Sequence, residues 1–238
     1  MADSLAQAKY SALTWNTPLS EAHATDLLGR LQLSEAKSIV DIGCGWGELL
    51  LRAAALAGPD IKATGVDTDQ LLLDRGARNA LERNIAAEFV QQRGEEFRGT
   101  ADRAVCIGSS HTLGGTREML KRLAEVVPRG RVLVGDNCYD SPPAKEVVDV
   151  LGEGILTLVE IVQLCRETGW EVLHLSTADQ REWDDFESGH RAGPREWLLA
   201  HPDDPQAAEV RELHDGRERE YLGAYRGVLG LVYLVLGR

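Results

Sequence analysis

A glycine-rich segment offers the clearest chemistry in this sequence of 238 residues. It contains Asp41, Gly43, Gly45 and Gly47 at alternate positions, between an apolar run and a helical pattern. Glycines at this spacing let the backbone turn tightly and approach a ligand, and the helix that follows presents free amides and a positive dipole end. Asp41 would repel a pyrophosphate but suits an ammonium group. The segment therefore predicts a site for a zwitterionic or cationic ligand.

A second acidic residue, Asp67, ends the next apolar run, 20 residues after Gly47. A carboxylate at the end of that strand accepts hydrogen bonds from both hydroxyls of a ribose, as in dinucleotide-binding folds. The dinucleotide pattern G-x-G-x-x-G would place its third glycine where this chain has Glu48. We therefore favour a nucleoside-bearing ligand other than a dinucleotide, and an NAD-dependent oxidoreductase stays open as an alternative.

Apolar runs alternate with helical patterns and predict the elements that position these residues. Such an alternation is typical of right-handed βαβ units around a parallel sheet. The predicted strands are 38–42, 61–66, 87–91, 103–107, 131–134, 171–175 and 228–236, and the predicted helices between the first five are 48–56, 70–84 and 116–127.

Two segments depart from this alternation. Residues 1–33 predict a helix from about residue 19, with Pro18 and Ser20 at its start. Residues 177–226 separate the last two strands and contain a charged helical pattern over 206–225. An insertion of this length is typical of a lid, a substrate wall or the surface of a homodimer.

The composition narrows the classes of partner and location. Lys and Arg total 26 against 38 Asp and Glu, a net charge of −12, which disfavours nucleic acid as a partner. The apolar runs are too short to span a membrane, and the first residues show no secretory signal. The four cysteines form no C-x-x-C pair, which favours free thiols in the cytoplasm.

These residues resemble those of the class I S-adenosylmethionine-dependent methyltransferases, and within them the bacterial small-molecule branch described as ubiquinone/menaquinone-biosynthesis-like. The resemblance rests on Asp41-x-Gly43-x-Gly45-x-Gly47 with Asp67, and on residues 106–111 after the fourth strand. Asn16-Thr17-Pro18 resembles the lid segment of such proteins, and Glu182-Trp183-Asp184 resembles their stretch after the sixth strand.

The resemblance implies a single Rossmann-like domain over residues 1–238. The fold would be an α/β three-layer sandwich with a seven-stranded, mostly parallel sheet of order 3-2-1-4-5-7-6. Its parts would be an N-terminal lid (1–33), a cofactor-binding core (34–176), a helical insertion (177–226) and a terminal strand (227–238).

The resemblance also implies S-adenosyl-L-methionine as cofactor and a role for each matching position. Asp41 would hold the methionine amino group through water, and Asp67 would clasp the ribose hydroxyls. Residues 94–95 would lie at the adenine. Ile107 and Gly108 would run beneath the cofactor and leave Ser109 and His111 facing the acceptor. The residues expected at the cofactor are Asp41, Gly43, Cys44, Gly45, Trp46, Gly47, Asp67, Thr68, Gly94, Glu95, Ile107, Gly108 and Ser109.

On the acceptor side, His111 is the candidate general base, because an imidazole exchanges protons near neutral pH. The alternative is a polar loop histidine, since orientation alone can supply most of the rate.

Asp136-Asn137 resembles the magnesium ligands of catechol-type methyltransferases. Those enzymes also require a carboxylate where this chain has Ser109-Ser110, so no metal is expected and Asp136 would face the acceptor pocket. Four aromatic residues could wall the acceptor or simply pack in the core: Tyr10, Trp15, Tyr139 and Trp183.

The predicted function is methyl transfer from S-adenosyl-L-methionine to a small-molecule acceptor by in-line displacement. A catalytically silent S-adenosyl-L-methionine-binding protein that acts as a partner or regulator stays open, because methyl transfer requires no obligatory side chain.

Overall fold

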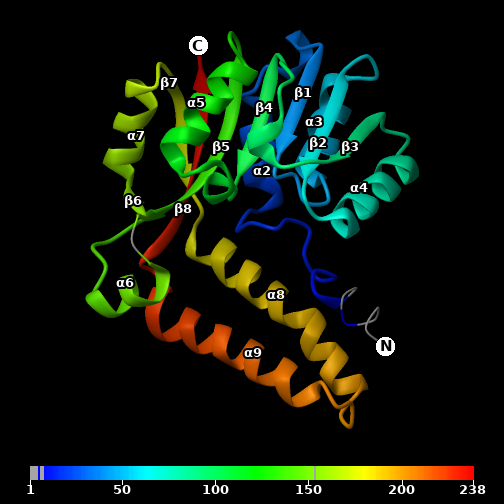
Figure 1. Ribbon diagram of the computed structural model, residues 1–238, viewed down its shortest axis with the longest axis vertical. Helices are drawn as coiled ribbons and strands as arrows, with labels where there is room; N and C mark the ends of the chain where they lie inside the picture. The colour runs from blue at the N-terminus through cyan, green and yellow to red at the C-terminus, as the bar shows by residue number, and fades with distance from the viewer. Residues whose placement is uncertain (1–4, 6–7, 153) are drawn as a thin grey trace. The chain divides into compact units, whose positions relative to one another are not determined.

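The computed structural model describes residues 5, 8–152 and 154–238, which form two compact units. The sheet unit comprises 20–138, 156–177 and 231–238. The helical unit comprises the described parts of 1–19, 139–155 and 178–230. Figure 1 shows the strands of the sheet unit and the helices α8 and α9 of the helical unit.

Among the described residues, eight strands form one sheet of order β3-β2-β1-β4-β5-β8-β7, and β6 pairs with β5 outside this path. The first five strands pair in parallel, whereas β7 and β8 are antiparallel. The strands are β1 (Ser38–Ile42), β2 (Lys62–Asp67), β3 (Ala87–Gln91), β4 (Arg103–Ile107), β5 (Arg131–Tyr139), β6 (Leu156–Thr157), β7 (Glu171–Thr177) and β8 (Leu229–Gly237).

The predicted Rossmann-like α/β fold is confirmed, and the predicted number of seven strands is wrong by one. The additional strand is β6, which has two residues and therefore no alternation that a sequence pattern could reveal. When β6 is left out of the numbering, the order matches the predicted one.

The helices that the sheet unit contributes are α2 (Glu21–Gly29), α3 (Glu48–Ala57), α4 (Gln70–Glu82), α5 (Thr116–Val126) and α7 (Leu158–Glu167). Short 3-10 turns follow at η1 (Leu33–Glu35), η2 (Gly94–Glu96) and η3 (Ser110–Leu113). The helical unit contains α6 (Lys145–Leu151), α8 (Gln180–Ala200), α9 (Ala207–Glu220) and the π-helical turn η4 (Tyr221–Tyr225). The sequence patterns did not predict α6 and α7.

Alternation along the strands distributes the core over both faces of the sheet. Val232 and Leu234 of β8 lie in one buried cluster with residues of α5 and α7. Tyr233, between them, lies on the opposite face, where its ring meets His23 of α2 edge to face at 5.0 Å. Strand β8, which lies between β5 and the edge strand β7, is buried along its whole length, as a strand covered on both faces requires.

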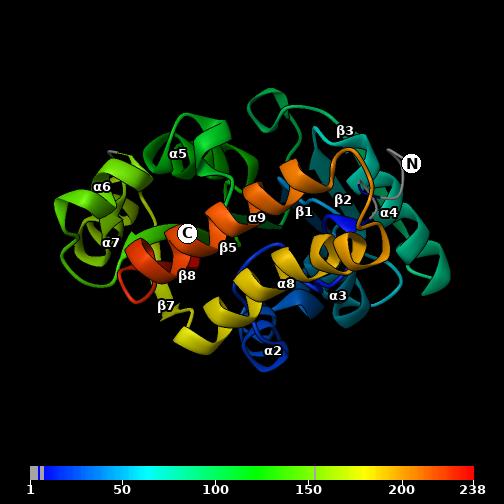
Figure 2. The same cartoon turned by 90° about the horizontal axis from the view of Figure 1, so that it is seen from below.

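In the helical unit, α8 and α9 lie side by side, as Figures 1 and 2 both show. The N-terminal segment packs tightly on α8, because a Cβ added at Gly193 would lie 2.0 Å from the Ala8 carbonyl oxygen. Pro194 lies inside α8 and does not end it. No helix among the described residues is long and apolar enough to cross a membrane.

Candidate cofactor site and active site

The glycine-rich loop joins β1 to α3 at the carboxyl end of the sheet's central strands. Gly43, Gly45 and Gly47 have φ angles of 76°, 55° and 66°, in the left-handed region that favours glycine. The Gly43 and Cys44 amides donate to the Val66 carbonyl at 2.8 and 3.0 Å, which pins the loop to β2. The position of the loop at the ends of parallel strands is where ligands bind in open α/β sheets.

The three glycines differ in what surrounds them. A Cβ at Gly43 would lie 2.0 Å from the Ser109 Oγ, and one at Gly47 would lie 2.5 Å from the Phe89 ring. A Cβ at Gly45 would meet nothing closer than 4.0 Å. Gly43 and Gly47 therefore permit close packing of neighbouring segments, whereas open space remains beside Gly45.

Asp67 connects the end of β2 to this loop. Its Oδ2 accepts a hydrogen bond from the Gly45 amide at 2.8 Å, and its Oδ1 accepts one from the Asp69 amide at 2.9 Å. Each carboxylate oxygen has a second lone pair that can accept a further hydrogen bond. The structure thus brings Asp67 and Gly45 together and holds the carboxylate in a fixed orientation for a pair of hydroxyls.

Asp41 lies in β1 and is only 4% exposed. Burial, with an additional effect of the nearby Asp67 carboxylate, raises the pKa of Asp41 to about 8. A ligand ammonium beside this carboxyl group would favour its charged form. The acidic pair and the glycine loop therefore fit a ligand that carries an ammonium group and two neighbouring hydroxyls, as S-adenosyl-L-methionine does.

The loop after β4 forms the next part of the candidate site. Gly108 has a φ of 66°, and a Cβ added there would meet no atom within 4 Å. Ser109 is buried and donates to the Ile107 carbonyl at 3.3 Å. His111 is exposed in η3. The loop therefore leaves open space at Gly108 and presents the imidazole to solvent.

Asp136 holds this loop in place, which the sequence did not predict. Its Oδ1 accepts a hydrogen bond from the Ser110 hydroxyl at 2.8 Å, and its Oδ2 accepts one from the Thr116 hydroxyl at 2.7 Å. Both carboxylate oxygens therefore bind the connection from β4 to α5, and the expectation that Asp136 faces the acceptor pocket stays a prediction. The sequence offers one signal for these contacts with Asp136, namely the two hydroxyl residues Ser110 and Thr116 on either side of Gly114-Gly115.

Other predicted cofactor residues have partners within the protein. Trp46 is 2% exposed, and the Arg75 guanidinium lies 4.1 Å from its ring centroid. Glu95 is exposed and pairs with Arg93 at 2.6 Å. Gly94 packs on β1, since a Cβ there would lie 2.6 Å from an Ile42 methyl group. Thr68 is exposed, and its carbonyl accepts a hydrogen bond from Gln91 at 3.0 Å.

The four aromatic residues expected at the acceptor belong to the helical unit. Tyr10 meets the His190 ring edge to face at 5.5 Å, and Trp183 meets the Phe186 ring at 6.1 Å. Trp15 and Trp183 are buried, whereas Tyr10 and Tyr139 are half-buried. Only the last two therefore present much of their side chains at a surface.

Comparisons with known proteins agree with this geometry. Residues 39–130 match the family described as "Methyltransferase domain". The chain is 33% identical over 221 residues to the uncharacterized protein YjhP of Escherichia coli (strain K12), with 88% of each chain covered. It is 36% identical over 121 residues to trans-aconitate 2-methyltransferase of Paracidovorax citrulli (strain AAC00-1), with 46% of this chain and 42% of that protein covered.

A crystal structure agrees as well. It is that of an SAM-dependent methyltransferase from Geobacter sulfurreducens in complex with S-adenosyl-L-homocysteine, and it matches with a TM-score of 0.88 and 28% identity over 98% of each chain. The chain belongs to the class I S-adenosylmethionine-dependent methyltransferases.

In this methyltransferase, Glu48 occupies the position where a dinucleotide-binding loop has its third glycine. The side chain is buried, and its carboxylate oxygens accept hydrogen bonds from Arg83 at 2.8 and 2.9 Å and from Arg52 at 2.8 Å. Burial by itself raises the pKa of Glu48, but the hydrogen bonds from Arg83 and Arg52 outweigh this effect, and the pKa is lowered. Among the described residues, the methyltransferase has no cluster of three or more His, Cys, Asp or Glu side chains that could hold a metal ion.

Proposed function

We propose that this methyltransferase transfers a methyl group from S-adenosyl-L-methionine to a small-molecule acceptor by in-line displacement. The arrangement of Asp41, Gly45 and Asp67 carries the proposal, because it combines a buried carboxyl group with an oriented carboxylate beside open space. The net charge of −12 supports an acceptor other than nucleic acid. The name of the trans-aconitate 2-methyltransferase supports a small-molecule acceptor.

On the cofactor side, we assign the amino group to Asp41 and the ribose hydroxyls to Asp67. The backbone at Gly45 and Gly108 would lie against the ligand, because no neighbouring side chain fills the space beside either glycine. When bound, S-adenosyl-L-methionine supplies an electrophilic methyl group on a sulfonium. The protein's own contribution is to orient the two reactants, which can account for much of a rate enhancement.

On the acceptor side, we assign proton removal to His111 and the positioning of its loop to Asp136. Both lie in the sheet unit with the cofactor residues. We retain Tyr10, Trp15, Tyr139 and Trp183 as candidates for acceptor contact, and residues 1–33 and 177–226 as the segments that exclude water during transfer.

A calorimetric titration with S-adenosyl-L-homocysteine tests the cofactor assignment. We expect a Kd tighter than about 100 µM, a weak limit for a cofactor site. Asp67→Ala removes two acceptor oxygens and should weaken binding by about 1–3 kcal/mol. Asp74→Ala is the matched control, because Asp74 is an exposed carboxylate of the adjacent helix α4. An unchanged affinity of the Asp67 variant contradicts the ribose assignment.

A turnover screen with a radiolabelled methyl donor and a panel of small acceptors separates the enzyme from a silent cofactor-binding protein. Competition between S-adenosyl-L-homocysteine and NAD tests the oxidoreductase alternative. We expect NAD to fail to compete, because the ion-paired Glu48 replaces the glycine that permits close packing of helix and strand in dinucleotide sites.

A further inference from the structure

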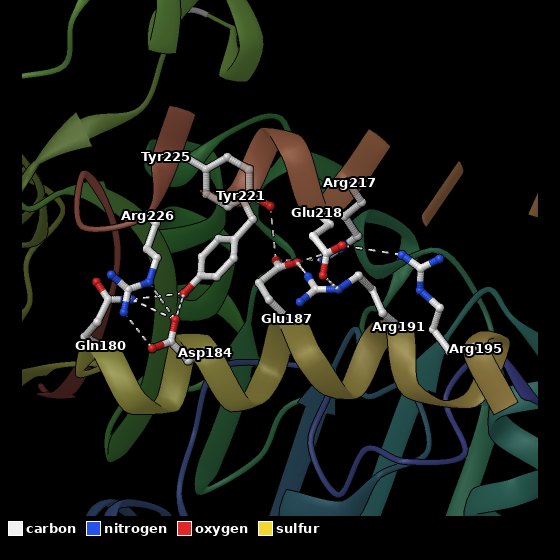
Figure 3. A network of polar contacts seen from close by, with 10 residues as sticks. All are labelled: Gln180, Asp184, Glu187, Arg191, Arg195, Arg217, Glu218, Tyr221, Tyr225 and Arg226. Carbon is white, nitrogen blue, oxygen red and sulfur yellow. Dashed lines mark hydrogen bonds and ion pairs between the residues drawn. The ribbon is translucent and has the colours of Figure 1, made fainter. Parts of the chain in front are cut away.

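The charged side chains of α8 and α9 bind one another, as Figure 3 shows. Glu187 accepts hydrogen bonds from Arg217 Nε at 2.8 Å and Nη2 at 2.9 Å, and from the Tyr225 hydroxyl at 3.2 Å. Asp184 accepts two hydrogen bonds from Arg226, both at 2.8 Å. This network stabilises the helical unit. In the sheet unit, by contrast, the contacts of one aromatic residue lead to the candidate cofactor site.

Phe89 of strand β3 lies among glycines from three other segments. Its ring lies 2.5 Å from a Cβ added at Gly47 and 2.6 Å from one added at Gly76 of α4. It lies 3.0 Å from a Cβ added at Gly65 of β2, the register partner of Phe89, so both positions face the same side of the sheet. The ring therefore fills space that only glycine leaves open at Gly47 and Gly76.

Gly47 connects this ring to the cofactor loop. Its amide donates to the Cys44 carbonyl at 2.8 Å, and its carbonyl accepts a hydrogen bond from the Leu51 amide at 2.9 Å. Within the same turn, the Gly45 amide donates to Asp67 Oδ2 at 2.8 Å. A shift of Gly47 would therefore move the turn 44–47 and, with it, the amide that orients Asp67.

Helix α4 packs on both the loop and the ring. A Cβ at Gly76 would also lie 3.0 Å from the Trp46 carbonyl oxygen, and the Arg75 guanidinium lies 4.1 Å from the Trp46 ring centroid. The Phe89 ring atoms Cε1 and Cζ are the closest ones to both Gly47 and Gly76. One edge of the Phe89 ring thus lies where α4 and the cofactor loop meet.

We propose that Phe89 is a positioning residue for cofactor binding. Its ring sets the spacing between α4 and the loop, and so holds Gly45 and Asp67 in the orientation that the ligand requires. The ring acts through the loop, without contact to the ligand. The inference rests on the proposed function, because it assumes that S-adenosyl-L-methionine binds at this loop.

Phe89→Leu tests this role, since leucine is apolar but does not fill the space of the ring. In a titration well below the unfolding temperature, we expect it to weaken binding of S-adenosyl-L-homocysteine by about tenfold, because binding must then also order the loop. Ile161→Ala is the control for lost stability, because Ile161 is buried in α7, which packs on α5, β6 and β7. It should lower the thermal midpoint and leave the affinity unchanged.

Gly76→Ala tests the same contact from α4, and it stays informative if Phe89→Leu fails to fold. Helix propensity favours alanine at this position, whereas overlap with the Phe89 ring opposes it. We expect Gly76→Ala to weaken S-adenosyl-L-homocysteine binding by about tenfold in the wild-type background and by less than about threefold in the Phe89→Leu background. Such non-additivity reports the contact itself, because the effects of independent sites add.

Hydrogen exchange of the ligand-free protein reports on the loop independently of the cofactor. The amides of Gly43, Cys44 and Gly47 are hydrogen-bonded, so they exchange slowly while the loop stays in place. We expect faster exchange at 43–47 in Phe89→Leu than in the wild type, and unchanged exchange there in Ile161→Ala.

Three results overturn the proposal: wild-type affinity in Phe89→Leu, equal weakening in Phe89→Leu and Ile161→Ala, or the same effect of Gly76→Ala in both backgrounds. Failure of the wild type to bind S-adenosyl-L-homocysteine contradicts the proposed function instead. Exchange at 43–47 then decides by itself whether Phe89 holds the loop.

Discussion

Asp41 suits a ligand with an ammonium group, but its burial makes the stability of the free protein depend on pH. Its folded pKa of about 8 lies above the ordinary value of 3.8, so near neutral pH the folded state holds a proton that the unfolded chain has released. The resulting stability is fully present below pH 3.8 and is lost as pH rises through about 8. A ligand ammonium reverses this by favouring the charged carboxylate.

Asp41→Asn should therefore flatten the pH dependence of the free protein's stability. We expect the wild type to lose up to about 1.4 kcal/mol of unfolding free energy per pH unit, relative to the variant, between pH 5 and 8. Urea unfolding of both proteins across this range measures the difference. Parallel profiles for the two proteins would show that Asp41 is ionised in the free folded state.

Asp136 affects the candidate site through the Ser110 and Thr116 hydroxyls. Asp136→Ala leaves both donors without their acceptor and should lower the unfolding free energy by about 1–3 kcal/mol. If the loop that it holds orients His111, kcat should fall more than the acceptor's KM rises. The neighbouring Asn137→Ala is the control, because Asn137 is exposed, and equal losses in both variants argue against a positioning role.

At the scale of elements, the stability of helix α8 depends on its close packing against the N-terminal segment. Gly193 lets the Ala8 carbonyl approach, since a Cβ at this position would lie 2.0 Å from that oxygen. Helix propensity favours alanine over glycine by up to about 1 kcal/mol in an exposed helix. Here the contact with the backbone of another segment outweighs that preference.

Gly193→Ala should accordingly lower the thermal midpoint, with a loss of about 1–3 kcal/mol from overpacking. Gly223→Ala meets no neighbouring atom and should not lower it. Differential scanning calorimetry of the two variants provides the measurement. A Gly193 variant as stable as the wild type would mean that the N-terminal segment can move away from α8 at little cost.

At the scale of the whole molecule, the cofactor residues gather in the sheet unit although they are spread from Asp41 to Ser109 in the sequence. Parallel pairing of β1 with both β2 and β4 brings the ends of these strands to one edge of the sheet. Ligand binding at this edge therefore links four separate loops.

Hydrogen exchange should detect this linkage as one pattern. With S-adenosyl-L-homocysteine at about 100 times its Kd, which adds about 2.7 kcal/mol of stability, short labelling should show slower exchange at 43–48, 67–69, 94–96 and 107–111. Helix α7, which packs against β7 and contributes no residue to these loops, serves as the internal control. Protection confined to one of the four loops would contradict a shared ligand site.

The sequence by itself determined the strand and helix alternation, the glycine loop and the acidic residue at the end of β2. These features depend on residues close together in the chain: apolar periodicity predicts strands at 38–42, 87–91 and 103–107, and all three agree with β1, β3 and β4. Helix α7 was missed although Thr157 and Glu160 form a capping box at its start, a local signal that was available.

Only the tertiary structure decided which of these residues have partners already. Folding places Asp136 against Ser110 and Thr116, 26 and 20 residues away, and no local pattern predicts these contacts. Burial, pKa and hydrogen-bond partners arise from such long-range contacts, and for that reason the chemistry of each side chain follows from the fold and not from the residue type alone.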